Sequence, residues 1–466
     1  MTTTPRTGHT LRDGKPTAPE AADTGTYDVV GVGVGPFNLA LAALTDEVPD
    51  ARALFLEQSD RFHWHPGMLM EGTTLQVPFL ADLVTMVDPT NPWSFLNYLR
   101  AHDRMFPFFF SERFHVPRRE YDDYCRWVAE SLPSCVFGAR VARLEHDAAT
   151  DTFTVEYVSG AARHRVRARN VVLGVGTAPA VPEPFRELVG ADVFHSGSYL
   201  DHRGHLDGAR DITVVGSGQS GAEIFLDLAR AQRDNGWRLR WLARTPAFAP
   251  MEYSKLGLEH FTPDYTDYFR GLPRHQRERL LPQQWQLYKG ISEETIGEIY
   301  DVLYERGVGG DPPDVTLAPS TEVTAAREHA GGYELTCRQT EQERAFTLHT
   351  DRVVLATGYT PRSPDFLEPV HDLVAWDEHG RYRVGGDYRV ELDAATSAGL
   401  YVQNAEMHTH GVGAPDLTLG AWRAATILNS VCGRKVHALP SRTAFTTFGV
   451  PADATPVTDT EHDHSH

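Results

Sequence analysis

GVGVGPFN, from Gly31 to Asn38, and GSGQSG, from Gly216 to Gly221, are the two stretches that decide the fold. Each follows a short run of apolar β-branched residues and opens a stretch with helical spacing. Glycines at such a turn let phosphates approach the backbone, and the helix that follows presents its N-terminal N–H groups to them. The two turns predict an α/β fold with two Rossmann-like dinucleotide-binding domains and a small, mainly helical substrate region.

The first glycine-rich turn is predicted to bind FAD. Gly33 and Gly35 take the first two glycine positions of the fingerprint, and Asn38 replaces the third. The next strand ends at Glu57, where a carboxylate suits the free ribose hydroxyls of FAD or NAD. A flavin paired with a hydride donor is the usual combination when one chain has two such turns.

The second turn is predicted to bind NADPH. All three glycine positions are filled, and the next strand ends on Arg244, with Arg240 upstream. A guanidinium there fits the 2′-phosphate of NADPH. A single glycine string is also typical of an ordinary tight turn, but the strand and helix context favours the nucleotide interpretation. The predicted NADPH site comprises Gly216, Gly218, Gln219, Ser220, Gly221 and Arg244.

Composition narrows the class of protein. The chain has 466 residues and a formal net charge of −19, which argues against nucleic-acid binding and favours a cationic small substrate. The longest aromatic run, Phe106 to Phe110, is far too short to span a membrane. The four cysteines form no CxxC pair, so no redox dithiol is predicted. We expect a cytoplasmic enzyme that assembles as a homo-oligomer.

Two similar apolar strands bracket the second turn. RNVVLGVGTAPAVP (residues 169–182) and DRVVLATGYTP (residues 351–361) both run into Gly-Thr turns, which is typical of chain crossings between two dinucleotide domains. The alternative is a pair of ordinary core strands. The predicted organisation is a disordered arm (1–25), a first FAD-domain segment (26–204), an inserted NADPH domain (205–345) with a helical substrate region at about 250–305, a second FAD-domain segment with a cover over the flavin (346–440), and a flexible tail (441–466).

No metal site is predicted. His63 with His65, and His408 with His410, have HxH spacing without a carboxylate partner, so structural or flavin-lining roles are favoured. The C-terminal EHDHSH could bind a metal weakly, but a solvated terminus is the simpler interpretation.

Longer motifs resemble a known family. WHPGMLMEGTTLQVPFLADLVTMVDPTNPWSFLNYL (Trp64 to Leu99) and HTHGVGAPDLTL (His408 to Leu419), together with the two turns and ATGY, resemble the flavin-dependent N-hydroxylating monooxygenases of hydroxamate siderophore biosynthesis. The resemblance extends from about Tyr27 to about Arg434. It implies that NADPH reduces FAD, that O2 adds at flavin C4a to form a hydroperoxide, and that the distal oxygen passes to a primary amine.

The resemblance also implies residue roles. Trp64 and His65 line the flavin, and Gln76 lies beside the isoalloxazine ring. Pro415 and Asp416 begin a predicted helix whose N-terminus would stabilise the negative charge of reduced flavin, although a simple buried helix with a capped start explains the pattern equally well. Asp416 and Leu417 would cover the flavin, and the candidate catalytic residues are Gln76, His410 and Thr418.

Two departures from the family pattern bear on the substrate. Family members that act on lysine or ornithine have a Lys in an FLKDL-like stretch and an Asn in an NExF stretch, which bind the amino-acid carboxylate. Here Ala81 and Leu258 take those positions. The expected substrate is therefore a carboxylate-free diamine, cadaverine or putrescine, since an unpaired buried carboxylate is costly. Lys255 or Lys289 could instead bind a carboxylate, which would leave lysine or ornithine as the substrate.

The distal ammonium of a diamine needs a partner, and Glu406, just before HTHG, is the candidate. Two rival classes stay open. One is a flavin monooxygenase acting on carbonyls or thioethers, although VFHSGSYLDH (residues 193–202) lacks the spacing of their linker motif. The other is a redox sensor that binds FAD and NADPH without catalysis.

Overall fold

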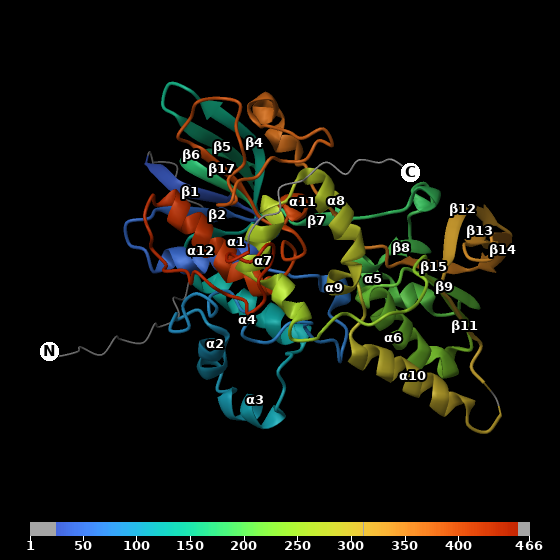
Figure 1. Ribbon diagram of the computed structural model, residues 1–466. Coiled ribbons are helices and arrows are strands. Elements are labelled where there is room, and N and C mark those ends of the chain that lie inside the picture. The colour runs from blue at the N-terminus through green and yellow to red at the C-terminus, as the bar shows by residue number, and fades with distance from the viewer. Residues whose placement is uncertain (1–24, 311, 455–466) are drawn as a thin grey trace, which may run out of the picture.

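The computed structural model describes residues 25–310 and 312–454 of the chain. Two sheets built around parallel strands form its centre, the first at the upper left of Figure 1 and the second at the right. Each sheet contains one of the two glycine-rich turns at the end of a parallel strand. This arrangement confirms the predicted α/β fold class.

The first sheet has seven strands in the order β3-β2-β1-β6-β5-β4, with β17 also paired to β6. Its strands run parallel from β3 to β6. β5 then pairs antiparallel with β6, and β4 pairs antiparallel with β5. The strands are β1 (Thr26–Val32), β2 (Ala53–Leu56), β3 (Cys135–Val136), β4 (Ala139–Asp147), β5 (Thr152–Ser159), β6 (Ala162–Leu173) and β17 (Gly399–Val402).

Helices cover both faces of this sheet. α1 (Pro36–Asp46), α4 (Arg118–Ser131) and α12 (Gly420–Val431) pack with Val29 and Phe55 in one core. α1 lies between the sheet and α12, and every residue from Asn38 to Thr45 is buried there. A helix covered on both sides in this way is apolar nearly all round. On the other face, the 3₁₀ helix η6 (Asp365–Leu373) packs against β4.

The second sheet has five parallel strands in the order β11-β10-β9-β15-β8. α6 (Gln219–Asn235) follows the second glycine-rich turn, and α10 (Glu293–Gly307) packs against α6. The strands are β8 (Val193–His195), β9 (Asp211–Val215), β10 (Arg238–Leu242), β11 (Val315–Ala318) and β15 (Arg352–Leu355). A small antiparallel sheet, at the right edge of Figure 1, consists of β12 (Thr321–His329), β13 (Gly332–Gln339) and β14 (Arg344–Thr350).

The stretch from residue 250 to 305 is mainly helical, as the sequence predicts. α7 (Pro263–Gly271) buries Tyr265 and Phe269 against Val412 and packs on α11 (Met407–His410). The other helices before α10 are η5 (Gly257–Phe261), α8 (Arg274–Gln283) and α9 (Trp285–Tyr288). The shorter elements elsewhere are η1 (Pro66–Met68), α2 (Phe95–Ala101), α3 (Met105–Ser111), η2 (Glu183–Phe185), η3 (Ser196–Ser198), α5 (Tyr199–His202) and η4 (Arg203–Leu206).

The two chain crossings between the sheets lie side by side. β7 (Thr177–Pro179) follows β6, β16 (Tyr359–Pro361) follows β15, and the two pair antiparallel. The second sheet also takes β8 from before residue 205 and β15 from after residue 345, outside the predicted insertion. β15 belongs to the second sheet because it pairs with β9, and β8 belongs to it because it pairs with β15. No local pattern in the sequence indicates these pairings.

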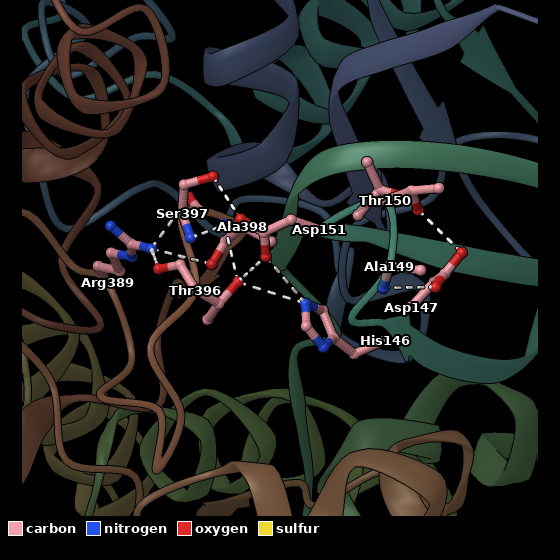
Figure 2. A network of polar contacts seen from close by, with 10 residues as sticks. His146, Asp147, Ala149, Thr150, Asp151, Arg389, Thr396, Ser397 and Ala398 are labelled. Atoms are coloured by element: carbon pink, nitrogen blue, oxygen red, sulfur yellow. Dashed lines mark hydrogen bonds and ion pairs between the residues drawn. The ribbon is translucent and has the colours of Figure 1, made fainter.

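Figure 2 shows how the segment before β17 is fastened to the β4–β5 hairpin. Asp151, in the hairpin turn, accepts hydrogen bonds from the backbone N–H (2.9 Å) and hydroxyl (2.6 Å) of Ser397 and from the hydroxyl of Thr396. These donors hold the pKa of the Asp151 carboxyl well below its ordinary value. Arg389 donates to the carbonyls of Ser397 (3.1 Å) and Ala398 (2.9 Å), so the loop is held from both sides.

The chain ends are only partly described. The predicted arm, residues 1–25, lies outside the described residues except for Gly25, as do residues 455–466 of the predicted tail. The first part of that tail contacts the helical region: the Thr443 N–H donates to Asp264 (3.0 Å) and the Phe445 N–H to Glu259 (2.8 Å). In the described part of the chain, no helix combines the length and apolar character needed to cross a membrane.

Candidate functional site

The first glycine-rich turn leaves an open cradle at the end of β1. Gly33 has φ +88°, and a Cβ there would lie 2.4 Å from the carbonyl oxygen of Gly174, so only glycine fits. Gly35 is the N-cap of α1 and has no side chain to cap the helix. A Cβ added at Gly35 would meet no atom within 4 Å. The N-terminus of α1 is therefore left without a side-chain cap and with open space beside Gly35, as a pyrophosphate site requires.

Glu57 and Asn38 fix this turn from two sides. The Glu57 carboxylate accepts hydrogen bonds from the N–H groups of Val34 and Ser59, both at 2.9 Å, which orients it at the rim of the turn. The buried Asn38 amide donates to Gly33 O (2.8 Å), and its oxygen accepts from Gln403 (2.7 Å). Asn38, predicted to bind the cofactor, thus holds the backbone of the turn through its side chain.

Trp64 and His65 lie where the two chain crossings meet. The backbone N–H of Trp64 donates to the Asp122 carboxylate (2.8 Å). The His65 ring stands edge-on to the rings of Trp64 (5.1 Å between centroids) and of Tyr359 in β16 (5.7 Å). Burial, reinforced by the Arg118 charge, lowers the pKa of His65 to about 4, so its ring is neutral at pH 7. His65 itself adopts the left-handed conformation, φ 48°.

Gln76 has a buried side-chain nitrogen without a hydrogen-bond partner among the described residues. An amide N–H left unpaired in the interior costs about 1 to 3 kcal/mol, which a ligand acceptor would recover. This orphaned donor fits the expectation that Gln76 faces an isoalloxazine ring, whose edge has carbonyl and ring-nitrogen acceptors.

The second glycine-rich turn forms a similar cradle at the end of β9. Gly216 has φ +127°, and a Cβ there would lie 2.0 Å from the carbonyl oxygen of Ala356. The Gly216 carbonyl oxygen accepts a hydrogen bond from the Trp241 indole N–H (2.6 Å). A Cβ added at Gly221 would lie 2.6 Å from the same oxygen. Gly218 is the N-cap of α6 without a side-chain cap, so the first N–H groups of α6 also face outward.

Gln219 and Ser220 both lie in the first turn of α6. The Gln219 amide accepts from the Ser292 N–H (2.7 Å) and donates to Glu223 (2.8 Å) and to Thr295 (3.0 Å). Its side chain therefore holds the start of α10 against α6. The structure records no side-chain hydrogen bond that assigns Ser220 a role.

The two arginines of β10 and its exit differ sharply. Arg240 is buried, pairs with Asp211 at 2.8 Å and donates to His349 O at 2.9 Å, so it is engaged within the fold. The Arg244 side chain is 79% exposed, with Glu322 4.0 Å away. Of the two guanidinium groups, that of Arg244 is the accessible one.

An ion pair that sequence analysis missed joins the two halves of the site. Arg118 at the start of α4 meets Glu223 of α6 through two parallel contacts of 2.7 Å, with side chains 12% and 5% exposed. Glu223 lies two residues after the second glycine-rich turn, and an acidic residue within an apolar helical stretch was the signal in the sequence that could have indicated a buried partner. Nothing in the sequence around Arg118 indicated its partner.

The predicted cover starts at a short 3₁₀ helix, η7 (Leu417–Leu419), which runs into α12. Asp416 caps it by accepting the Thr418 N–H (2.7 Å), and burial raises the pKa of its carboxyl. Leu417 packs against the core of the first sheet. The predicted helix start is confirmed, and Gly420 lies against Phe37 of the first glycine-rich turn.

Arg423 of α12 holds this cover in place. It is fully buried, donates to the carbonyl of Ala414 (2.6 Å) and lies over the Phe37 ring (4.5 Å). Glu406 lies 3.1 Å from Arg423, and both side chains are at most 1% exposed. The prediction that Glu406 binds a substrate ammonium is therefore not retained, because its carboxylate is already paired with Arg423.

His410 is part of the same buried region. Its Nδ1 is 2.8 Å from the Thr409 hydroxyl, and its ring stacks on Tyr388 at 4.5 Å. Burial lowers the pKa of His410 well below its ordinary value, so its ring is neutral at pH 7. It stays a candidate catalytic residue.

The other three candidate substrate residues, besides Glu406, lie in different environments. Ala81 is 3% exposed, next to the buried Asp82, which accepts the Phe95 N–H (2.7 Å). Leu258 on η5 is 39% exposed. Lys289 lies beside the second glycine-rich turn, since a Cβ on Gly218 would be 3.5 Å from the Lys289 carbonyl oxygen. Only Ala81 combines burial with the missing polar group.

The family model for L-lysine 6-monooxygenase/L-ornithine 5-monooxygenase matches residues 25–361. The chain is 43% identical to the rhizobactin siderophore biosynthesis protein RhbE of Rhizobium meliloti, over 92% of this chain and 96% of that protein. It is 39% identical to a putrescine N-hydroxylase of Shewanella oneidensis, over 91% of this chain and 85% of that protein.

A solved structure is similar over nearly the whole chain. It is the FAD-bound cadaverine monooxygenase DfoA of the desferrioxamine pathway of Erwinia amylovora, with a TM-score of 0.89 and 38% identity over 92% of this chain and 100% of that one. The chain belongs to the L-lysine 6-monooxygenase/L-ornithine 5-monooxygenase family.

Proposed function

We propose that the chain is an FAD- and NADPH-dependent monooxygenase that N-hydroxylates a primary amine of putrescine or cadaverine for hydroxamate siderophore biosynthesis. The observation that carries the proposal is the likeness to two diamine hydroxylases, one at 39% identity and the other with a TM-score of 0.89, in a chain whose position 81 is a buried alanine. A lysine or ornithine N-monooxygenase is the second candidate, because the matching family model describes those activities.

The cofactor assignment rests on the two cradles. The α1 N-terminus with Glu57 suits the adenosine diphosphate of FAD, and the α6 N-terminus with Arg244 suits NADPH. When bound, FAD supplies the centre that activates O2, and NADPH supplies the reducing hydride. The protein contributes the orphaned Gln76 amide and the capped turn Asp416–Thr418, both of which donate or orient N–H groups.

Substrate choice rests on what position 81 lacks. An amino-acid carboxylate beside buried Ala81 would lose water without gaining a cation, at a cost of several kcal/mol. A diamine has no carboxylate and avoids that cost. Leu258 is exposed, so water can solvate a carboxylate beside it, and its apolar side chain contributes less to substrate choice than Ala81 does.

An amine panel tests the function. Purified protein with FAD, NADPH and O2 is given putrescine, cadaverine, lysine or ornithine, and each N-hydroxylated product is measured by mass spectrometry. NADPH oxidation alone is insufficient, since it also reports peroxide release. Faster formation of N-hydroxylysine or N-hydroxyornithine would favour the second candidate, and ester or sulfoxide products from other substrates would indicate a different flavin monooxygenase. A cytoplasmic location and a homo-oligomeric assembly stay predictions.

A further inference from the structure

Three potential metal ligands lie together on the small antiparallel sheet. Glu334 of β13 is paired across the sheet with Arg327 of β12 on one side and His349 of β14 on the other. His329, two residues beyond Arg327, shares its face of the sheet because side chains alternate along a strand. The ligand atoms of His329, Glu334 and His349 all lie within 4.8 Å of one another, and no other group of this kind occurs among the described residues.

Arg327 orients the carboxylate toward the two histidines. Its guanidinium donates from Nε to Oε1 of Glu334 at 2.8 Å, which leaves Oε2 directed at His349, 3.8 Å from Nε2. The Glu334 side chain is only 16% exposed, so its position is constrained by the sheet. The rings of His329 and His349 are 5.2 Å apart and open to solvent. The group is therefore partly preorganised and accessible to a dissolved ion.

We propose that His329, Glu334 and His349 bind one divalent transition-metal ion of the zinc class, with water completing its coordination. Two imidazole nitrogens and a carboxylate oxygen form a donor set that suits Zn²⁺, Co²⁺ or Ni²⁺, whereas Mg²⁺ and Ca²⁺ prefer oxygen alone. Tetrahedral coordination with bonds of about 2.1 Å places ligand atoms about 3.4 Å apart. The present ligand atoms lie within 4.8 Å of one another, so metal binding requires the two exposed histidine side chains to move closer.

The site shares no side chain with the proposed FAD, NADPH and substrate sites. Its ligands come from three adjacent strands, so a bound ion joins β12, β13 and β14 and stabilises their sheet. The expected consequence is a zinc-dependent rise in thermal stability. Catalysis requires no change, which separates failure of this proposal from failure of the function assigned above.

Zinc titration of the full-length protein tests the site. Because the C-terminal EHDHSH also has imidazoles, the background is the chain with His462→Ala, His464→Ala and His466→Ala. Isothermal titration calorimetry should show one Zn²⁺ per chain in this background and no binding of Mg²⁺ at the same concentration. Adding His329→Ala with His349→Ala, or Glu334→Gln alone, should weaken Zn²⁺ binding at least tenfold and abolish the zinc-dependent rise in Tm.

A matched control replaces two histidines of comparable exposure outside the group. His371 and His379 have side chains that are 64% and 55% exposed, and His371→Ala with His379→Ala should leave Zn²⁺ affinity within twofold of the background. Absence of stoichiometric zinc binding in the background overturns the proposal. So does retention of affinity within twofold after loss of His329 and His349.

Discussion

Arg118 and Glu223 form a bidentate ion pair that connects the helix α4 beside the first sheet to the helix α6 of the second glycine-rich turn. Glu223 also accepts a hydrogen bond from Gln219, so the pair extends to α10. Burial raises the pKa of Glu223, and the Arg118 charge opposes that shift. This ion pair thus connects α4, which packs against the first sheet, to α6, which begins at the second glycine-rich turn.

Removing one partner of this pair should destabilise the protein strongly. Arg118→Met leaves the Glu223 carboxylate buried without its cation, at an expected cost of about 3 kcal/mol. Arg118→Met with Glu223→Met should cost less than Arg118→Met alone, because no charge is left unpaired. Thermal unfolding of the two variants measures the difference.

The control is an exposed pair of the same type. Arg143 and Glu145 are 48% and 46% exposed, so Arg143→Met should change Tm little. Equal losses for Arg118→Met and Arg143→Met would contradict the view that Arg118 and Glu223 anchor the two helices.

Local patterns in the sequence were sufficient for the nucleotide turns. The positive φ of Gly33 and Gly216, the start of α12 and the cap at Asp416 all follow from residues close in sequence. Backbone sterics and capping act over a few residues, so a single stretch contains the information needed. The predicted roles of these residues toward FAD and NADPH stay predictions.

Long-range pairing is where prediction from the sequence failed. Glu406 was expected to meet a substrate ammonium, but its carboxylate is paired with the Arg423 guanidinium. Arg118 and Glu223 are 105 positions apart. Which buried charge pairs with which depends on the packing of whole helices, and residue type alone does not reveal it.

A branched side chain at Gly35 should abolish flavin binding. A Cβ there meets nothing within 4 Å in the protein, so Gly35→Val fits the fold while occupying the space predicted for the pyrophosphate. The purified variant should lack yellow flavin absorbance. Gly204→Val, also at an open position, is the control and should retain it. Full FAD content in folded Gly35→Val protein would refute the assignment.

Coenzyme choice should depend on Arg244. Arg244→Ala is expected to weaken NADPH by on the order of 2 kcal/mol and NADH much less, because only NADPH has the 2′-phosphate. The ratio of kcat/KM for the two coenzymes measures the effect. Arg238→Ala, at the start of the strand β10 that precedes Arg244 and with a side chain 46% exposed, should preserve the ratio. Equal losses with NADPH and NADH in Arg244→Ala would mean that Arg244 is structural.

Stability in acid should depend on His65. Its pKa is about 4 in the folded protein, compared with about 6.5 in an unfolded chain, so the unfolded state binds more protons between these values. Stability therefore falls as pH drops from 6.5 toward 4, by up to about 3 kcal/mol from this group. His65→Gln should flatten the curve of Tm against pH in that window. The exposed His371→Gln control should follow the wild type, and an unchanged slope in His65→Gln would refute the assignment.

Restoring a cation at position 81 should change the substrate. Ala81 is buried in the stretch where amino-acid hydroxylases of the resembled family have lysine, so Ala81→Lys should favour lysine by roughly 1 to 3 kcal/mol and repel a diamine ammonium. Adding Leu258→Asn should contribute less, since Leu258 is 39% exposed. Leu80→Lys, at the neighbouring exposed position, is the matched control and should keep the diamine preference. The ratio of N-hydroxylated lysine to N-hydroxylated cadaverine, measured in variants that retain bound FAD, decides the outcome. An FAD-loaded Ala81→Lys enzyme with the wild-type ratio would show that position 81 does not select the substrate.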